Sequence, residues 1–185
     1  AGGLDFDTVE ARVKLDDGDH PIGVDLRRKT DATSLVEEAM ILANETVAAH
    51  LCGAGFPGIF RVHERPAAES LEGLVPVFQE FSWFDAVDRN KLIAGDPREL
   101  QRILAVSANR SEGELVSSLV LRSMKRAVYR PVCDSHYGLA SAAYAHFTSP
   151  IRRYPDLVVH RMLKAQIGRR PEKFDQEVSA LSWIA

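Results

Sequence analysis

Cysteine is scarce in this sequence, and long apolar runs are absent from it. The 185 residues include only Cys52 and Cys133, without C-x-x-C spacing, so the pattern predicts neither a disulfide framework nor a zinc knuckle and favours two free thiols. No apolar stretch approaches the roughly 18 residues of a membrane-spanning helix, and no basic start precedes an apolar run as in a secretory signal peptide. We therefore expect a cytoplasmic protein without membrane contact, because that compartment keeps thiols reduced.

Internal repeats and low-complexity tracts are also lacking, which indicates one compact unit with no internal domain boundary. The composition, 45% hydrophobic and 26% charged, is that of an ordinary globular protein. A chain of this length buries roughly two-thirds of its surface on folding. We predict a single unit over residues 1–185.

Charge is unevenly distributed along the chain. The formal net charge is −3, yet residues 110–185 hold 12 Lys/Arg against 7 Asp/Glu, while residues 1–109 hold 11 against 19. Such an asymmetry indicates either that the second half faces an anionic partner or that it presents solvated basic helix faces. Composition does not choose between these two interpretations.

Alternation of apolar and polar residues predicts a β-hairpin near the N-terminus. Apolar side chains occupy every second position over residues 9–15 and again over residues 22–26, on either side of an Asp-rich turn at 16–19. This period of two is typical of paired strands with one buried face.

Helical patterns dominate the residues that follow. A helix is predicted over about residues 34–51, because Thr33 and Ser34 offer N-caps and Ser34-x-x-Glu37 has the spacing of a capping box. The apolar residues 59–62 are predicted to form a short buried strand. Residues 82–96 are predicted to be a surface loop. Three further helices are expected near residues 67–81, 97–107 and 114–128. The predicted fold class is thus α+β and predominantly helical, with a hairpin, five to six helices and a short strand region.

The segment over residues 136–161 carries the most chemistry. Ser149 suits an N-cap and Pro150 suits the first position of a helix, which we predict to begin there. Two cations beside a positive helix end are unfavourable, so Arg152 and Arg153 predict a phosphate bound by guanidinium groups and backbone N–H groups. Alternatively, Asp156 or another carboxylate pairs with them. Pro155 either kinks this helix or restarts it at residues 154–155.

The run YAHFTSPIRRYPD at residues 144–156 is long enough to be specific. HYGL precedes it at 136–139, and VHR follows it at 159–161. With GGLDFD at 2–7, LVEEAMILAN at 35–44, FRVH at 60–63 and RSMKRA at 122–127, it resembles the C-terminal portion of the catalytic (RNB) domain of ribonuclease R/ribonuclease II exoribonucleases. The likeness covers residues 2–167, and the histidine in AHFTSP is closer to the ribonuclease R version.

The resemblance implies a 3′-to-5′ exoribonuclease that degrades single-stranded RNA processively to nucleoside 5′-monophosphates by Mg²⁺-dependent hydrolysis. It implies that Arg152 is catalytic and steadies the scissile phosphate. It also implies that Phe6 stacks on terminal bases and that Glu38 accepts a hydrogen bond from a ribose 2′-OH. Without the resemblance, Phe6 is simply a core residue and Glu38 an exposed helix acid. The other residues implied to contact RNA or shape the site are Arg61, Tyr137, Ser149, Arg153 and Tyr154.

Metal ligands are not expected in this chain. The family's ligands belong to an aspartate-rich motif N-terminal to the matching segment, and the family's small RNA-binding β-barrels are lacking too. Four histidines show no i, i+4 pair and are interpreted as structural or RNA-contacting: His63, His136, His146 and His160. The aspartates near the N-terminus flank Phe6 or sit in the turn: Asp5, Asp7, Asp16, Asp17 and Asp19. We expect Mg²⁺ to require the missing N-terminal half of the domain, and this chain alone to be inactive.

Two other hypotheses remain open. One is a non-catalytic RNA-binding or assembly module that uses Arg152 and Arg153 only to hold phosphates, with salt-sensitive and Mg²⁺-independent binding. The other is a helical interaction domain whose arginines pair internally, and it predicts no RNA binding at low salt.

Overall fold

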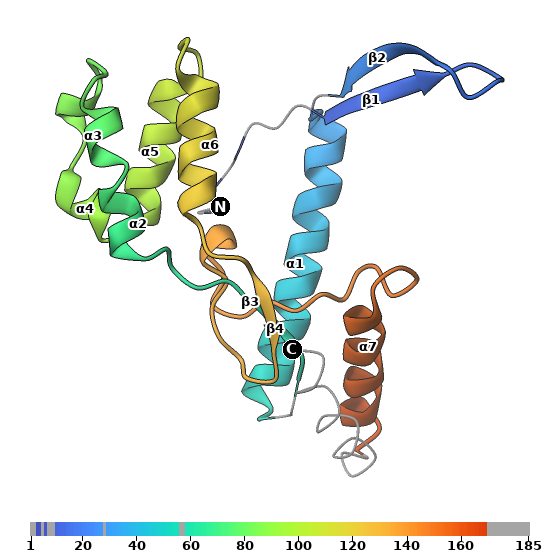
Figure 1. Cartoon of the computed structure of the whole chain (residues 1–185). Helices are drawn as coiled ribbons and strands as arrows, with labels where there is room; N and C mark the ends of the chain where they lie inside the picture. The colour runs from blue at the N-terminus through green and yellow to red at the C-terminus, as the bar shows by residue number, and fades with distance from the viewer. Residues whose placement is uncertain (1–2, 5, 7–9, 28, 56–57, 170–185) are drawn as a thin grey trace.

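A long helix, α1, runs from the N-terminal β-hairpin to the region of the short strands β3 and β4 (Figure 1). The computed structural model describes residues 3–4, 6, 10–27, 29–55 and 58–169. In chain order the larger elements are β1 (Glu10–Leu15), β2 (Pro21–Arg27), α1 (Asp31–Gly53), β3 (Phe60–Val62), α2 (Ala68–Glu72), α3 (Val75–Phe78), α4 (Arg89–Ile93), α5 (Pro97–Ser107), α6 (Gly113–Ser123), β4 (Val128–Arg130) and α7 (Tyr154–Ile167). Two short 3₁₀ helices are η1 (Phe84–Ala86) and η2 (Tyr137–Leu139). The predicted α+β, mainly helical class is confirmed.

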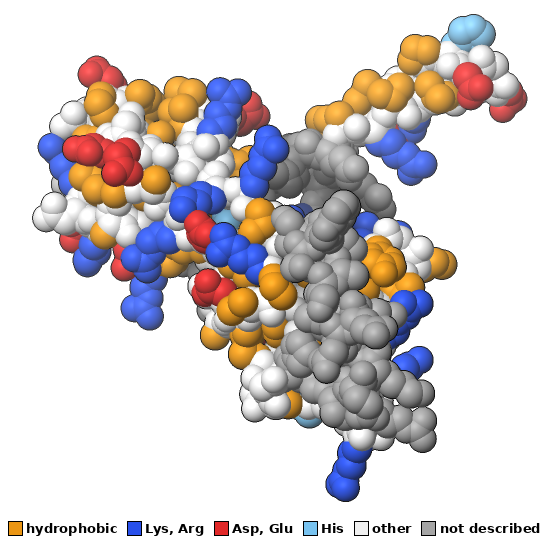
Figure 2. Space-filling view, turned by 60° about the horizontal axis from the view of Figure 1, so that its bottom comes forward, with side chains coloured by type: hydrophobic (Ala, Val, Ile, Leu, Met, Phe, Trp, Pro, Cys, Tyr) orange, Lys and Arg blue, Asp and Glu red, His pale blue; other side chains and the backbone are white. Residues whose placement is uncertain are grey.

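The β-hairpin is confirmed, but its buried face is not. Strands β1 and β2 are antiparallel, with Val13 opposite Val24, and Asp16 Oδ1 closes the turn by accepting the N–H groups of Gly18 and His20 at 2.8 and 2.9 Å. Val13 and Val24 are nevertheless 54% and 60% exposed. The hairpin projects away from the other elements as an arm with hydrophobic side chains along it (Figure 2), so nothing described here covers its apolar face.

Helix α1 begins earlier than predicted. Its N-cap is Thr30, whose Oγ1 accepts the N–H of Thr33, while Thr33 Oγ1 accepts the N–H of Thr30 at 2.8 Å. The capping box is therefore shifted from the predicted Ser34 pair, because a Thr side chain completes it as well as a Glu does. The C-terminal half of α1 is buried through Ala48 and Leu51.

Helices α2 to α6 enclose one of two hydrophobic clusters. The predicted surface loop at residues 82–96 is wrong: it contains η1 and α4, and Phe84 and Leu92 are buried in this cluster. Asp88 is the N-cap of α4, where its side chain accepts two backbone N–H groups. The helix predicted at 67–81 is divided into α2 and α3 around Gly73, whereas α5 has the predicted bounds.

The second cluster lies where α1 ends. The predicted strand at residues 59–62 is confirmed as the buried strand β3, which pairs antiparallel with β4. The helix predicted at 114–128 is shorter than expected, because α6 stops at Ser123, and β4 begins at the last predicted position, Val128. The cluster combines buried side chains of α1, β3, the segment before the arginines and α7: Ala48, Leu51, Ile59, Phe60, Val62, Ala145, Val158, Val159 and Met162. The single unit over residues 1–185 remains a prediction.

Cys52 and Cys133 form a disulfide, so the prediction of two free thiols is wrong. Their Cα atoms lie 6.0 Å apart although 81 positions separate them along the chain. The last turn of α1 and the loop after β4 meet beside the second cluster, and sequence spacing carries no information about that meeting. The cysteines therefore give no support to a reducing compartment. Among the residues that the structure describes, no helix has the length and apolar character needed to cross a membrane.

Candidate functional site

A tight turn precedes α7 and presents the two arginines. The carbonyl oxygen of Ser149 accepts the N–H groups of Arg152 and Arg153 at 3.2 and 3.1 Å, and α7 starts only at Tyr154. The prediction of a helix start at residues 149–150 is therefore wrong, and the restart at 154–155 is confirmed. Pro155 explains this start, because its missing N–H is harmless only in the first turn of a helix.

The two adjacent arginines differ in their partners. Asp156 is fully buried, and its Oδ1 accepts the N–H of Ser149 at 2.7 Å and the guanidinium of Arg153 at 2.8 Å. Internal pairing, the alternative to a phosphate site, thus holds for Arg153. Arg152 is exposed, and no carboxylate of the described residues lies within ion-pair distance of it. One guanidinium of the pair remains available to an external anion.

Arg152 borders a small cavity of about 190 Å³ between the turn and α1. Glu37 and Asn44 of α1 face it from one side, and Tyr144, Ser149 and Arg152 belong to the other. The cavity therefore brings a cation, a carboxylate and several hydrogen-bonding groups around a space of limited size. This is the kind of surrounding that a phosphate with its attached sugar requires.

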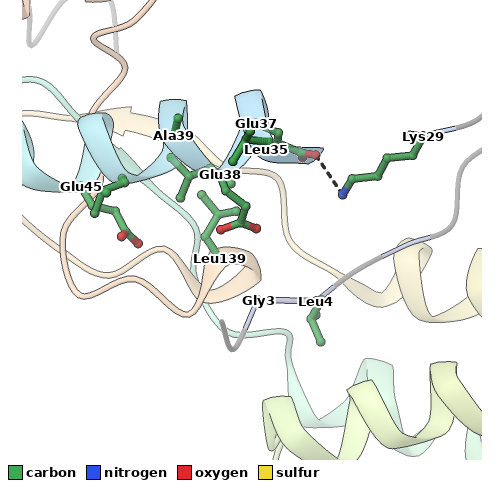
Figure 3. A pocket seen from close by; sticks show the side chains of 11 residues that line it. Gly3, Leu4, Lys29, Leu35, Glu37, Glu38, Ala39, Glu45 and Leu139 are labelled. Carbon is green, nitrogen blue, oxygen red and sulfur yellow. Dashed lines mark ion pairs between the residues drawn. The ribbon is translucent and has the colours of Figure 1, made fainter. Parts of the chain in front are cut away.

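A larger cavity of about 680 Å³ adjoins it along α1 and contains Glu38. Figure 3 shows Glu38 and Glu45 extending from α1 toward Leu139. Glu37 is held by an ion pair with Lys29 at 2.9 Å, marked there by the dashed line. The two cavities share three lining residues: Glu37, Ile41 and Leu139. Glu38 and Arg152 thus lie on adjoining cavities, which the sequence did not show.

Asn44 is a site residue that the sequence analysis did not single out. It is only 3% exposed and connects α1 with the segment that leads to the arginines. Its Nδ2 donates to the hydroxyl of Tyr144 at 2.9 Å, and its Oδ1 accepts the N–H groups of Phe147 and Thr148 at 2.9 and 3.2 Å. The sequence signal was a polar residue on an otherwise apolar helix face. Burying such a residue is costly unless its polar atoms are hydrogen-bonded, so it indicates a buried contact.

Three of the histidines belong to a chain of ring contacts beside β3. The ring centroids of His63 and His136 are 5.1 Å apart, and the hydroxyl oxygen of Tyr129 lies 2.7 Å from Nδ1 of His146. Burial, with added repulsion from neighbouring positive charge, lowers the pKa of His136 and of His146 to about 4. Burial also lowers the pKa of His63, whose Nδ1 accepts a backbone N–H while its Nε2–H donates to the carbonyl of Lys125. These rings are neutral at pH 7.

The contacts of these histidines are with other protein groups, which favours a structural role over contact with RNA. The fourth, His160, stacks on Phe147 with ring centroids 4.1 Å apart, and its Nε2 lies 2.9 Å from the Phe147 carbonyl oxygen. Within the described ranges, no group of three or more His, Cys, Asp or Glu residues is placed to hold a metal ion. Asp5 and Asp7 lie outside those ranges.

Several predicted RNA-contacting residues lie away from the two cavities. Phe6 packs against the cluster of α2 to α6. The hydroxyl of Tyr137 is buried and donates to the carbonyl of Gly95 at 2.8 Å, and burial raises its pKa to about 12. The guanidinium of Arg61 lies 4.7 Å from the ring centroid of Tyr129. Tyr154 is 53% exposed at the start of α7. Their roles in RNA binding stay predictions.

Comparison with known proteins identifies the class. The model of the RNB domain matches residues 1–169, and the chain belongs to this family. It is 43% identical to ribonuclease R of Aquifex aeolicus and 40% identical to that of Thermotoga maritima, over 95% and 98% of this chain. Those alignments cover 24% and 26% of the relatives, so the chain spans about a quarter of their length.

Solved structures agree with this assignment. Ribonuclease R of Mycoplasma genitalium, in complex with ribose-methylated single-stranded RNA, is 29% identical and superimposes with a TM-score of 0.83, over 98% of this chain and 28% of that one. Yeast Ssd1, described as a pseudonuclease, is 28% identical with a TM-score of 0.67, over 83% of this chain and 19% of that one. The predicted resemblance to the ribonuclease R/II family is confirmed.

Proposed function

We propose that this chain is the part of a 3′-to-5′ exoribonuclease that holds the 3′ end of single-stranded RNA. One observation carries the proposal: Arg152 is exposed beside a cavity, while its neighbour Arg153 is neutralised by Asp156. A guanidinium that pairs with no carboxylate of the described residues, beside hydrogen-bonding groups, matches a phosphodiester in charge and in geometry. The similarity to a ribonuclease R bound to single-stranded RNA supports the same class of ligand.

Each predicted residue has a role in this proposal. Arg152 contacts the scissile phosphate and stabilises the negative charge that develops there. Glu38, on the adjoining cavity, accepts a hydrogen bond from a ribose 2′-OH, which favours RNA over DNA. Arg153 and Ser149 shape the turn through Asp156. Phe6 is proposed to stack on the terminal bases, and the other residues proposed to contact the RNA or shape the site are Arg61, Tyr137 and Tyr154.

Mg²⁺-dependent, processive hydrolysis to nucleoside 5′-monophosphates is proposed for the complete enzyme in the cytoplasm. The described residues offer no group that fits the metal, and we assign it no ligand and no step in this chain. The N-terminal half of the catalytic domain is therefore the proposed source of the ligands. We propose that the 185-residue chain binds RNA and does not hydrolyse it alone.

Binding of a fluorescent single-stranded RNA, measured by anisotropy at several salt concentrations, tests the role of Arg152. We expect Arg152→Ala to weaken binding about tenfold and to reduce the salt slope by about one, because one phosphate contact is lost. Arg98→Ala removes another exposed arginine, on α5, and is the matched control. Equal binding by both variants would refute the role of Arg152.

A second candidate is a non-catalytic RNA-binding module, which the similarity to the pseudonuclease Ssd1 favours. The two candidates differ once an N-terminal half of the catalytic domain is supplied as a separately purified protein. Mg²⁺-dependent release of mononucleotides by the mixture, abolished by Arg152→Ala, supports the enzyme. Unchanged RNA binding without release supports the module. Release by the pure chain alone would contradict the proposed need for the N-terminal half.

A further inference from the structure

We propose that Asn44 is the positioning residue that sets the place of Arg152 relative to Glu38. The inference rests on the proposed function, because it assigns the purpose of a buried amide to the RNA site. Asn44 touches no substrate in this scheme. It acts through the segment over residues 144–149, which leads directly into the turn that presents Arg152.

All polar groups of the Asn44 side chain are used across the interface between α1 and this segment. The carbonyl oxygen accepts two consecutive backbone N–H groups, those of Phe147 and Thr148, and the amide nitrogen donates to the hydroxyl of Tyr144. These bonds join residues 100 to 104 positions apart and bury the amide almost completely. Such bonds fix both the distance and the rotation of the segment against the helix.

Two consecutive residues of the segment are hydrogen-bonded to two different helices. Thr148 is held by Asn44, and the next residue, Ser149, donates its N–H to the buried Asp156 of α7. The Ser149 carbonyl then accepts the N–H groups of Arg152 and Arg153. The backbone before Arg152 is thus fixed to α1 on one side and to α7 on the other. With only one of these two contacts, the turn that carries Arg152 would be free to move relative to the other helix.

The α1 anchor matters for RNA because the same helix carries Glu38. Asn44 lies six positions after Glu38, and α1 is continuous between them. The helix is held to the second cluster by Ala48 and Leu51, one and two turns beyond Asn44. Because an α-helix rises about 1.5 Å per residue, the distance along α1 between Glu38 and Asn44 is fixed. Asn44 consequently sets the separation between the proposed ribose acceptor and the proposed phosphate ligand.

Hydrogen–deuterium exchange of the full 185-residue chain tests the positioning directly. Asn44→Leu keeps the branched shape and the number of heavy atoms, with a larger side chain, and removes every polar contact. We expect faster exchange over residues 144–153. Asn44→Asp retains the two accepted bonds and is expected to restore slow exchange. Thr46→Ala, which loses only an intrahelical bond to Leu42, is the matched control in the same helix. If Asn44→Leu does not fold, Asn44→Ser replaces it, since its shorter side chain cannot reach both N–H groups.

A double-mutant cycle then tests whether Asn44 acts through Arg152. We expect Asn44→Leu to weaken RNA binding about tenfold alone and to add nothing in an Arg152→Ala background, because the contact it positions is already gone. Independent, additive losses overturn the proposal, as does unchanged exchange over residues 144–153 in Asn44→Leu. If RNA binding proves insensitive to Arg152→Ala, the proposed function fails, and the exchange experiment still decides whether Asn44 holds the segment.

Discussion

Reduction of the Cys52–Cys133 bond should destabilise the chain strongly. The bond closes a loop of 81 residues, and in the chain-entropy model a loop of this size costs the unfolded state about 15 cal/mol/K, or about 4.5 kcal/mol at 25 °C. Measured effects of native disulfides are commonly about 2–5 kcal/mol. For a domain of this size each kcal/mol corresponds to about 2–4 °C in Tm. We expect Tm to fall by about 5–15 °C on reduction.

Scanning calorimetry with and without a phosphine reductant measures this difference. The double variant Cys52→Ser/Cys133→Ser is the control, since its Tm should match that of the reduced chain and should not respond to the reductant. Intact mass before each scan records whether the two thiol hydrogens are present. A fully reduced chain that melts at the temperature of the oxidised one would refute the reasoning, and two titratable thiols in the untreated chain would refute the disulfide itself.

Two further predictions concern buried polar groups. Because the pKa values of His136 and His146 are about 4 in the folded chain, the unfolded chain binds more protons below pH 6.5; stability should therefore be full above pH 6.5 and decrease as pH falls toward 4. Urea midpoints at pH 7.5, 6 and 5 measure this, and a flat profile would contradict it. Asp156→Ala should cost about 2–3 kcal/mol in the free energy of unfolding, since it leaves a partly buried guanidinium and a backbone N–H without their partner. Exposed Asp134→Ala is its control, and equal urea midpoints for the two variants would argue against this role.

Local patterns predicted local structure well. The hairpin and the strand at residues 59–62 follow from alternation or a short apolar run, and α5 has the bounds predicted from its helical pattern. Errors arose where several residues can cap a helix. At the start of α1, the hydroxyls of Thr30, Thr33 and Ser34 are all candidates for the N-cap. They also arose at residues 82–96, where polar residues cap helices in place of forming a loop.

Contacts across long sequence separations were beyond such patterns. The Cys52–Cys133 bond and the reach of Asn44 to Phe147 depend on how α1 packs against the segments around β3 and β4. Nothing in the neighbouring residues encodes that packing. The exposed hydrophobic face of the hairpin shows the converse case: alternation correctly indicated paired strands and an apolar face, and the described residues do not cover it.

Arg152 and Arg153 show why chemistry needs the fold as well as the motif. The two are adjacent and identical in type, so the local pattern alone assigns them the same phosphate chemistry. The restart of α7 at Tyr154 places Asp156 in its first turn, three positions after Arg153, where the carboxylate can reach that guanidinium. The same carboxylate anchors Ser149 and is fully buried. Its charge therefore stabilises the fold itself. Arg152, which pairs with no carboxylate of the described residues, lines the cavity together with Glu37.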